Sequence, residues 1–120
     1  RLDGSTIEPS SKSELAASLI GTGFSYLPEG RAAEAEYLAR VLPAGRDVRC
    51  FGSAALNLCW VACGRLDGFY QRNMQRWDFA AGEIIAKEAG AAIAHPRPEN
   101  GHLMVASGPG IHAELVRLVS

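Results

Sequence analysis

The chain has 120 residues, of which 48% are hydrophobic and 21% charged, and its formal net charge at pH 7 is −1. This length suits one globular domain that buries roughly two thirds of its unfolded surface. The near-neutral charge excludes a strongly basic surface for nucleic acid or anionic membranes, and no apolar run reaches the ~20 residues of a membrane-spanning helix.

The sequence begins at Arg1, without a methionine or a signal-peptide pattern, and runs directly into a turn. We therefore expect a piece of a longer, cytoplasmic protein that has no nucleic-acid or membrane partner. The three cysteines, Cys50, Cys59 and Cys63, lie in apolar surroundings. They are expected to be reduced core residues, because a zinc site would require paired Cys or His ligands.

Short strand patterns and helices alternate in the first half of the chain. Asp3-Gly4 predicts a hairpin turn, and residues 11–20 predict a short helix that leads into a strand over residues 18–26. Gly21 and Gly23 would permit a close approach of the backbone in that strand. Residues 29–42 predict an amphipathic helix, and residues 47–52 predict the next strand. The inner face of this helix comprises Ala33, Tyr37, Leu38 and Val41, and its outer face comprises Arg31, Glu34, Glu36 and Arg40.

The second half continues the alternation. Residues 53–64 predict a helix that is apolar nearly all round and therefore buried, with Ser53 as its N-cap and Gly64 just beyond its end. Its polar residue, Asn57, is expected to make structural hydrogen bonds. Residues 66–71 and 102–108 predict strands, and residues 78–89 and 110–119 predict helices. The expected inward residues of these helices are Ala81, Ile84 and Ile85 in the first and Ile111, Leu115 and Leu118 in the second, while Glu83 and Lys87 pair outside.

Strands that alternate with helices predict a layered α/β fold, in which helices cover both faces of a largely parallel sheet. No linker or repeat divides the chain, so residues 1–120 are expected to form one domain. Ligands of such open sheets bind beyond the carboxyl ends of the strands, where the following helices start.

One predicted helix start carries a carboxylate. Asp78 follows Trp77 at the start of the helix over residues 78–89, where an aspartate most often only caps the helix. Trp77 could instead enclose the carboxylate in a cleft, and carboxylates are the ligands that Mg²⁺ prefers. The small residues at 80–82 would allow a ligand or another segment to approach this turn. Helix physics alone leaves both interpretations, cap and metal ligand, open.

A second helix start lies at residues 52–55. Gly52 lacks a Cβ, and the backbone N–H groups of Ser53 to Ala55 are available to an oxyanion or a hydroxyl. A capped, buried helix would show the same pattern. Because both helix starts follow strands, they could face one cleft.

The stretch GSAALNLCWVACGRLDGFYQ at residues 52–71, followed by WDFAAGEIIAKEAGA at 77–91, resembles the C-terminal half of the inositol monophosphatase family, the Mg²⁺-dependent, lithium-sensitive phosphomonoesterases. That family carries a G-[ST]-A-A-x-x-x-C-x-V-A-x-G-x-x-D pattern and then W-D-x-A-A-G at this separation. The resemblance extends to SLIGTGFSY at residues 18–26 and to the opening turn, so it covers essentially the whole chain.

The resemblance implies roles for particular residues. Asp78 matches the family's metal-ligand aspartate, which would bind Mg²⁺, and the backbone of Gly52, Ser53 and Ala54 matches part of the pocket for the substrate ring. Gln71 stands where several members have a glutamate that holds a substrate hydroxyl. The phosphate monoester is therefore open among inositol, histidinol, fructose and nucleotide types. No residue of this chain beyond the metal ligand is implied to be catalytic.

The family's other metal ligands, and the threonine that helps to activate water, belong to an N-terminal half with an Asp-Pro-[Ile/Leu]-Asp-Gly-Thr motif. LDGST at residues 2–6 lacks the preceding Asp-Pro, and Asp3 is interpreted as a turn residue. We therefore expect a phosphatase as the full-length parent, while this half alone is inactive, exposes an apolar face and self-associates as a homo-oligomer. The alternative is a noncatalytic binding or assembly module that retains the fold.

Overall fold

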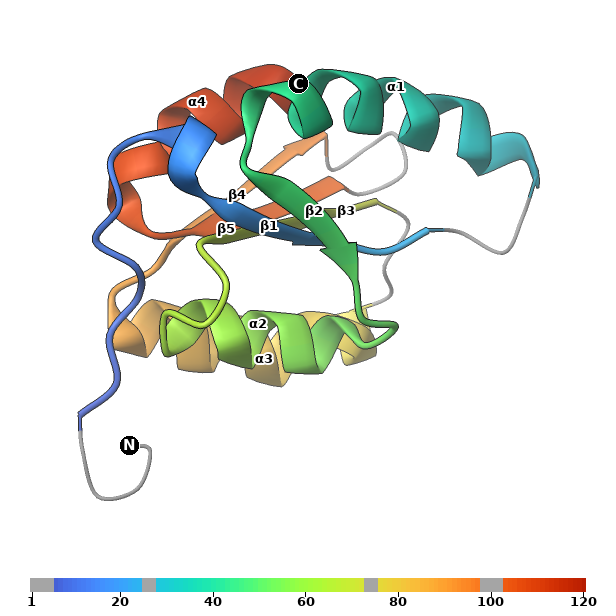
Figure 1. The fold of residues 1–120 in the computed structure, drawn as a ribbon. Helices are drawn as coiled ribbons and strands as arrows, with labels where there is room; N and C mark the ends of the chain where they lie inside the picture. Colours follow the sequence, from blue (N-terminus) through green and yellow to red (C-terminus); the bar gives the residue numbers. More distant parts are fainter. Residues whose placement is uncertain (1–5, 25–27, 73–75, 98–102) are drawn as a thin grey trace.

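A five-stranded sheet lies at the centre of the molecule, between two layers of helices (Figure 1). The structure is a computed structural model that describes residues 6–24, 28–72, 76–97 and 103–120, apart from the side chains of Glu29, Arg76, Asp78 and Arg97. The predicted turn at Asp3-Gly4 lies outside these residues. The strands are β1 (Leu19–Thr22), β2 (Asp47–Cys50), β3 (Gly68–Gln71), β4 (Ala92–Arg97) and β5 (Leu103–Ser107), in the order β2-β1-β3-β5-β4.

Most strands of this sheet run in one direction. β1 pairs in parallel with β2 and β3, whereas β5 is antiparallel to both β3 and β4. β1 to β4 are therefore aligned, and β5 runs against them. Helices α2 (Ala54–Ala62) and α3 (Arg76–Ala89) cover one face, and α1 (Pro28–Ala44) and α4 (Pro109–Val119) cover the other (Figure 1). This arrangement confirms the predicted α/β layers with a largely parallel sheet.

Each face of the sheet has its own apolar core. The core under α2 and α3 is centred on Leu58, Val61, Leu66, Phe69, Phe79 and Met104. The core under α1 and α4 is centred on Ile20, Tyr37, Val41, Leu103, Ile111 and Leu115. Among the described residues, no helix combines the length and the apolar character that crossing a membrane would require.

Two predictions for the first half need correction. The helix expected over residues 11–20 is only the 3-10 turn Leu15–Ala17, because a short, serine-rich segment does not offset the cost of helix nucleation. In α1, Tyr37 and Val41 are buried as predicted. Glu34, expected on the outer face, is only 4% exposed. It precedes Tyr37 by three residues and Val41 by seven, so it lies on the same stripe of the helix.

Helix α2 begins and ends as predicted. Ser53 Oγ accepts a hydrogen bond from the N–H of Leu56 at 3.2 Å, and Gly64 adopts a φ of +82° just beyond the helix. The helix is not buried all round, since Leu56 is 40% exposed on its outer side. Asn57 is 1% exposed, and neither of its amide atoms has a hydrogen-bond partner in the described structure. The structural hydrogen bonds expected for Asn57 are therefore not found.

Helix α3 turns a different face inward from the one expected. Ala81, Ile84 and Ile85 are predicted to be inward, but Ala81 is exposed, and Ile84 and Ile85 are 61% and 41% exposed. A Cβ added to Gly82 would lie 2.8 Å from the Cβ of Leu58 in α2 and 2.9 Å from its Cδ1. The glycine lets the two helices approach closely, and the face with the small residue therefore packs inward.

Two further details of the helices differ from expectation. Glu83, predicted to pair with Lys87, is hydrogen-bonded to the imidazole of His95 of β4. In α4, the first two predicted inward residues are buried, but the third buried position is Val119 and not the half-buried Leu118. Positions 118 and 119 both follow Leu115 at a helical spacing of three or four residues, so spacing alone does not choose between them.

Asp67 lies just before β3 and binds both the first residue of β1 and Lys12, in the segment that precedes β1. It is 4% exposed, and its Oδ2 accepts hydrogen bonds from the Leu19 N–H at 2.7 Å and from Lys12 Nζ at 3.0 Å. Burial by itself raises the pKa of this carboxyl. Hydrogen bonds from Ser10, Leu19 and Lys12 outweigh burial and hold the pKa of Asp67 below its ordinary value of 3.8.

Gly82→Ala is expected to destabilise the protein, although alanine is the better helix former. Helix propensity favours alanine by about 1 kcal/mol. Forcing a methyl group against Leu58 costs about 1–3 kcal/mol, because a Cβ fixed to the α2 backbone cannot swing away. Urea unfolding should show a net loss of up to about 2 kcal/mol, and the exposed control Ala81→Ser should stay within about 0.5 kcal/mol. A Gly82→Ala variant more stable than the wild type by the full gain in helix propensity would contradict close packing here.

Asp67→Asn is expected to destabilise the protein in a pH-dependent way. Because its folded pKa is lowered, the carboxylate's contribution is fully present above the unfolded pKa of 3.8 and is lost as the pH falls through the folded pKa. Urea unfolding should show a loss of about 1.5–3 kcal/mol at pH 7, and this loss should shrink toward zero at an acid pH below the lowered folded pKa. The control Asp47→Asn, from an exposed pair with Arg49, should leave the midpoint nearly unchanged. An Asp67→Asn loss of the same size at both pH values would refute the charged role.

Candidate active site

The carboxyl ends of β1, β2 and β3 meet at one edge of the sheet. Thr22 is paired with Cys50 of β2 and with Tyr70 of β3, so the three strands end level with one another. Helix α2 follows β2 and helix α3 follows β3, and both helices begin at this edge (Figure 1). The structure therefore brings the turn at residues 52–54 and Gln71 to one edge, where open α/β sheets bind ligands.

The turn before α2 suits an anion or a hydroxyl group. Gly52 has a φ of +80°, a backbone conformation that favours glycine. A Cβ added there would meet nothing within 4 Å, so open space lies beside this residue. Ser53 uses its hydroxyl to cap the N–H of Leu56. The amides of Ala54 and Ala55, in the first turn, have no acceptor within the helix. Together with the positive end of the helix dipole, they favour a negatively charged group.

The side chain of Gln71 lies directly over Gly23, the residue that follows β1. A Cβ added to Gly23 would lie 2.4 Å from Oε1 and 2.7 Å from Cδ of Gln71. Gly21 is approached in the same way by Leu66 Cδ1 and Asn57 Oδ1, at 2.8 and 3.1 Å from an added Cβ. Close approach at both glycines is therefore confirmed, although side chains and not the backbone make the approach.

Asp78 lies in the first turn of α3. The helix begins at Arg76, so Asp78 is its third residue and not the residue just before it. An acidic residue at this position is favoured by the helix dipole. The Asp78 side chain lies outside the described part of the structure, and the choice between a local helix role and a metal ligand stays a prediction. Trp77 is 80% exposed, and whether its ring encloses the carboxylate stays a prediction as well.

The described residues do not form a complete metal site. Within them, no group of three or more His, Cys, Asp or Glu side chains is placed to hold a metal ion. Mg²⁺ usually keeps several waters and takes one or two protein carboxylates together with substrate phosphate. Asp78 could supply one carboxylate of such a shell, and the other ligands would have to come from elsewhere.

Cys50, Cys59 and Cys63 are all free thiols, in agreement with the expected reduced state. Cys59 and Cys63 are half-buried on α2. Cys50 is exposed at the end of the edge strand β2, so the prediction of a core position is wrong for this residue.

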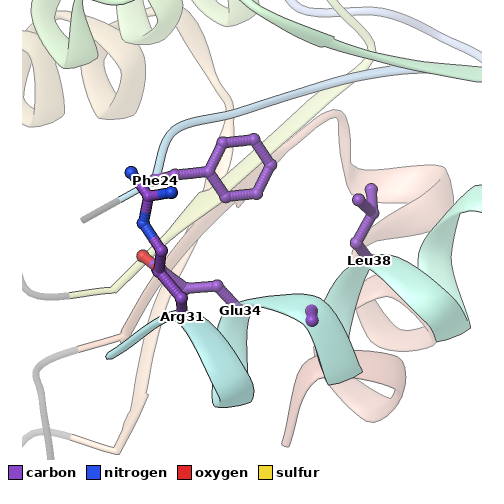
Figure 2. Close-up of a pocket in the computed structure, with 5 residues that line it drawn as sticks. Phe24, Arg31, Glu34 and Leu38 are labelled. Carbon is purple, nitrogen blue, oxygen red and sulfur yellow. The ribbon is translucent and has the colours of Figure 1, made fainter. Parts of the chain in front are cut away.

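A cavity of about 250 Å³ lies beside α1 (Figure 2). Phe24, which follows β1, lines it together with Arg31, Glu34, Ala35 and Leu38 of α1. Because α1 covers the opposite face of the sheet from α2 and α3, this cavity is not the predicted substrate pocket. The sequence pattern did not indicate it, since its charged lining residues were expected to face solvent.

Comparisons with known proteins agree on one family. The profile of the inositol monophosphatase family matches residues 1–119. Inositol-1-monophosphatase SuhB of Mycobacterium tuberculosis (strain ATCC 25618 / H37Rv) is 51% identical over 106 residues, which cover 86% of this chain and 37% of that protein. The putative Nus factor SuhB of Neisseria meningitidis serogroup B is 36% identical over 128 residues, which cover 99% of this chain and 48% of that protein.

A solved structure of Mycobacterium tuberculosis SuhB matches with a TM-score of 0.85 and 47% identity, over 94% of this chain and 45% of that chain. This chain therefore spans less than half the length of each of these relatives. The structural match covers nearly all of the sheet and its helices, so fold and sequence lead to the same conclusion. The chain belongs to the inositol monophosphatase family.

Proposed function

We propose that this chain is the C-terminal α/β domain of a Mg²⁺-dependent phosphomonoesterase that hydrolyses a small phosphorylated alcohol of the inositol phosphate type. The observation that carries the proposal is the meeting of three elements at one sheet edge: the turn before α2, Gln71 and the first turn of α3. The Mycobacterium tuberculosis relative bears the name inositol-1-monophosphatase, which supports the same class of reaction.

Each group has its own task in this proposal. The backbone of Gly52, Ser53 and Ala54 orients the alcohol portion of the substrate, and Gln71 hydrogen-bonds one of its hydroxyls. Asp78 provides one carboxylate ligand for Mg²⁺, while the positive end of α3 favours the anions gathered there. A divalent cation, when bound, neutralises phosphate charge and makes water a better nucleophile.

The same proposal includes a missing N-terminal half that completes the site. The described residues contain no cluster of three potential ligands, and the resemblance assigns the remaining ligands to that half. This chain also spans less than half of the relatives it matches. On this basis the 120 residues alone are inactive. Lithium sensitivity, a cytoplasmic location and assembly into a homo-oligomer belong to the proposal for the whole protein.

A noncatalytic binding or assembly module is the second candidate function. It is favoured by the name of the Neisseria meningitidis relative, a putative Nus factor, which matches 99% of this chain. It is also favoured by the outer side of α3, where Trp77, Ile84 and Ile85 are 80%, 61% and 41% exposed. Exposed apolar residues of this kind mark surfaces that a partner covers. In this alternative Asp78 only stabilises the start of α3.

Asp78→Asn is expected to lower Mg²⁺-dependent hydrolysis of inositol 1-phosphate by more than about 100-fold in the protein that contains this chain. The amide keeps the size of the side chain but lacks the anionic ligand. Even loss of an outer-shell partner of a bound metal lowers activity by roughly 10- to 100-fold. The measurement is release of inorganic phosphate at limiting and saturating Mg²⁺. Glu88→Gln, which removes an exposed carboxylate from the same helix, is the control and should keep its activity.

Two results would separate the candidate functions. A full rate in Asp78→Asn, or no hydrolysis of any phosphate monoester by the wild type, would favour the assembly module. The need for a second half is tested on the 120-residue chain, purified free of contaminating phosphatase. Mg²⁺-dependent turnover by that chain, abolished by Asp78→Asn, would show that no second half is required.

A further inference from the structure

We propose that Gly23 is a positioning residue for substrate recognition, because the absence of a side chain leaves room for the carboxamide of Gln71 to lie directly over its Cα. We call this space over Gly23 the seat. This inference deepens the proposed function, since it rests on Gln71 as the group that meets a substrate hydroxyl. It concerns a residue that has no assigned role at the carboxyl edge of the sheet.

Because Gly23 has no side chain, the side chain of Gln71 has room above it. The Oε1, Cδ and Nε2 atoms of Gln71 lie 2.4, 2.7 and 3.0 Å from the place of an added Cβ, so the whole carboxamide covers the glycine Cα. Gly23 does not belong to the glycines with positive φ among the described residues, and its conformation is open to any residue. Gly52 is the opposite case, with a φ of +80° and nothing within 4 Å of an added Cβ.

Gly23 lies between the two parts of the candidate site, the turn at Gly52 and Gln71. β1 lies between β2, which leads into the turn at Gly52, and β3, which ends at Gln71. Gly23 follows Thr22, the residue that is paired with both neighbouring strands. A side chain that leaves the end of β3 and lies over Gly23 therefore crosses toward the β2 side of the edge.

The carboxamide on this seat is available to a ligand. Gln71 is half-buried, and no hydrogen bond joins its side chain to another described residue. A carboxamide both donates and accepts hydrogen bonds, and so does a hydroxyl group, whereas a carboxylate only accepts. The carboxamide over Gly23 can therefore either donate a hydrogen bond to a substrate hydroxyl or accept one from it.

Gly23→Ala is the direct test, because the substitution removes the seat without removing Gln71. The atoms that a methyl group would meet are the far end of a flexible side chain, so Gln71 should swing away while the fold is kept. We expect KM for inositol 1-phosphate to rise by roughly 3- to 10-fold, the effect of one neutral hydrogen bond, with kcat little changed. Hydrolysis of phenyl phosphate, which has no such hydroxyl, should be unaffected.

Matched variants show whether the effect passes through Gln71. Gln71→Ala should raise KM to the same extent, and the double variant Gly23→Ala/Gln71→Ala should show no further loss. Gly21→Ala, on the same strand, would push against Leu66 and Asn57 in the interior, so it should lower stability without a selective effect on the polyol substrate. An unchanged KM in Gly23→Ala, an equal effect on phenyl phosphate, or additive losses in the double variant would overturn the proposal.

A crystal structure of Gly23→Ala separates this inference from the proposed function. The Gln71 side chain should leave its wild-type rotamer, with the carboxamide displaced from β1, whether or not the protein hydrolyses any phosphate. If the displacement is found and no substrate is turned over, the seat stands and the phosphatase proposal fails. If Gln71 keeps its wild-type position beside Ala at this site, the seat itself is refuted.

Discussion

The close contact between α2 and α3 at Gly82 controls the geometry of the carboxyl edge of the sheet. Leu58 of α2 packs against the α3 backbone at a point where any Cβ would overlap it. Asp78 lies four residues before Gly82, which is about one helical turn or 6 Å along the axis. The spacing between the two helix starts is therefore set within about two turns of the contact. A larger residue at position 82 would separate the helices and move one half of the candidate site relative to the other.

The polar groups at the amino and carboxyl edges of the sheet differ in their hydrogen bonding. At the amino edge, Asp67 is buried and holds the Leu19 amide and Lys12. At the carboxyl edge, the Gln71 carboxamide has no hydrogen bond to the described residues, and the turn at Gly52 borders open space. Satisfied groups stabilise a fold, whereas unsatisfied groups at one edge are the usual mark of a place where a ligand binds.

Local patterns in the sequence predicted most of the elements in their order, but they missed the strand β4 (Ala92–Arg97), to which no element was assigned. The alternation of strands and helices, the Ser53 cap and the positive φ of Gly64 follow from short-range rules. The inner face of α3 did not follow, because the helix has two apolar stripes and only its contact with Leu58 selects the one with Gly82. The burial of Glu34 was missed for a related reason, since its charge suggested solvent while its spacing from Tyr37 and Val41 indicated the core.

Contacts between residues that are far apart in the sequence also limited the prediction of the site. Gly52, Gln71 and Asp78 were predicted as site residues from the resemblance to a known family. The elements that carry them lie at one edge because β1, β2 and β3 end side by side. No local rule pairs Gly23 with Gln71, which lies 48 residues away in the chain and meets it only through the parallel pairing of β1 and β3. Asp67 likewise depends on Leu19, which is equally distant in the sequence. Contacts of this kind exist only once the sheet has formed.

The most direct test of this account is a crystal structure of the protein that contains this chain, grown with Mn²⁺ and inorganic phosphate. The anomalous signal of manganese identifies the ion without reference to activity. The account predicts Mn²⁺ at about 2.1 Å from a carboxylate oxygen of Asp78, with phosphate between the ion and the first turn of α2. Manganese bound elsewhere, with Asp78 bonded only to the amides of its own helix, would contradict it.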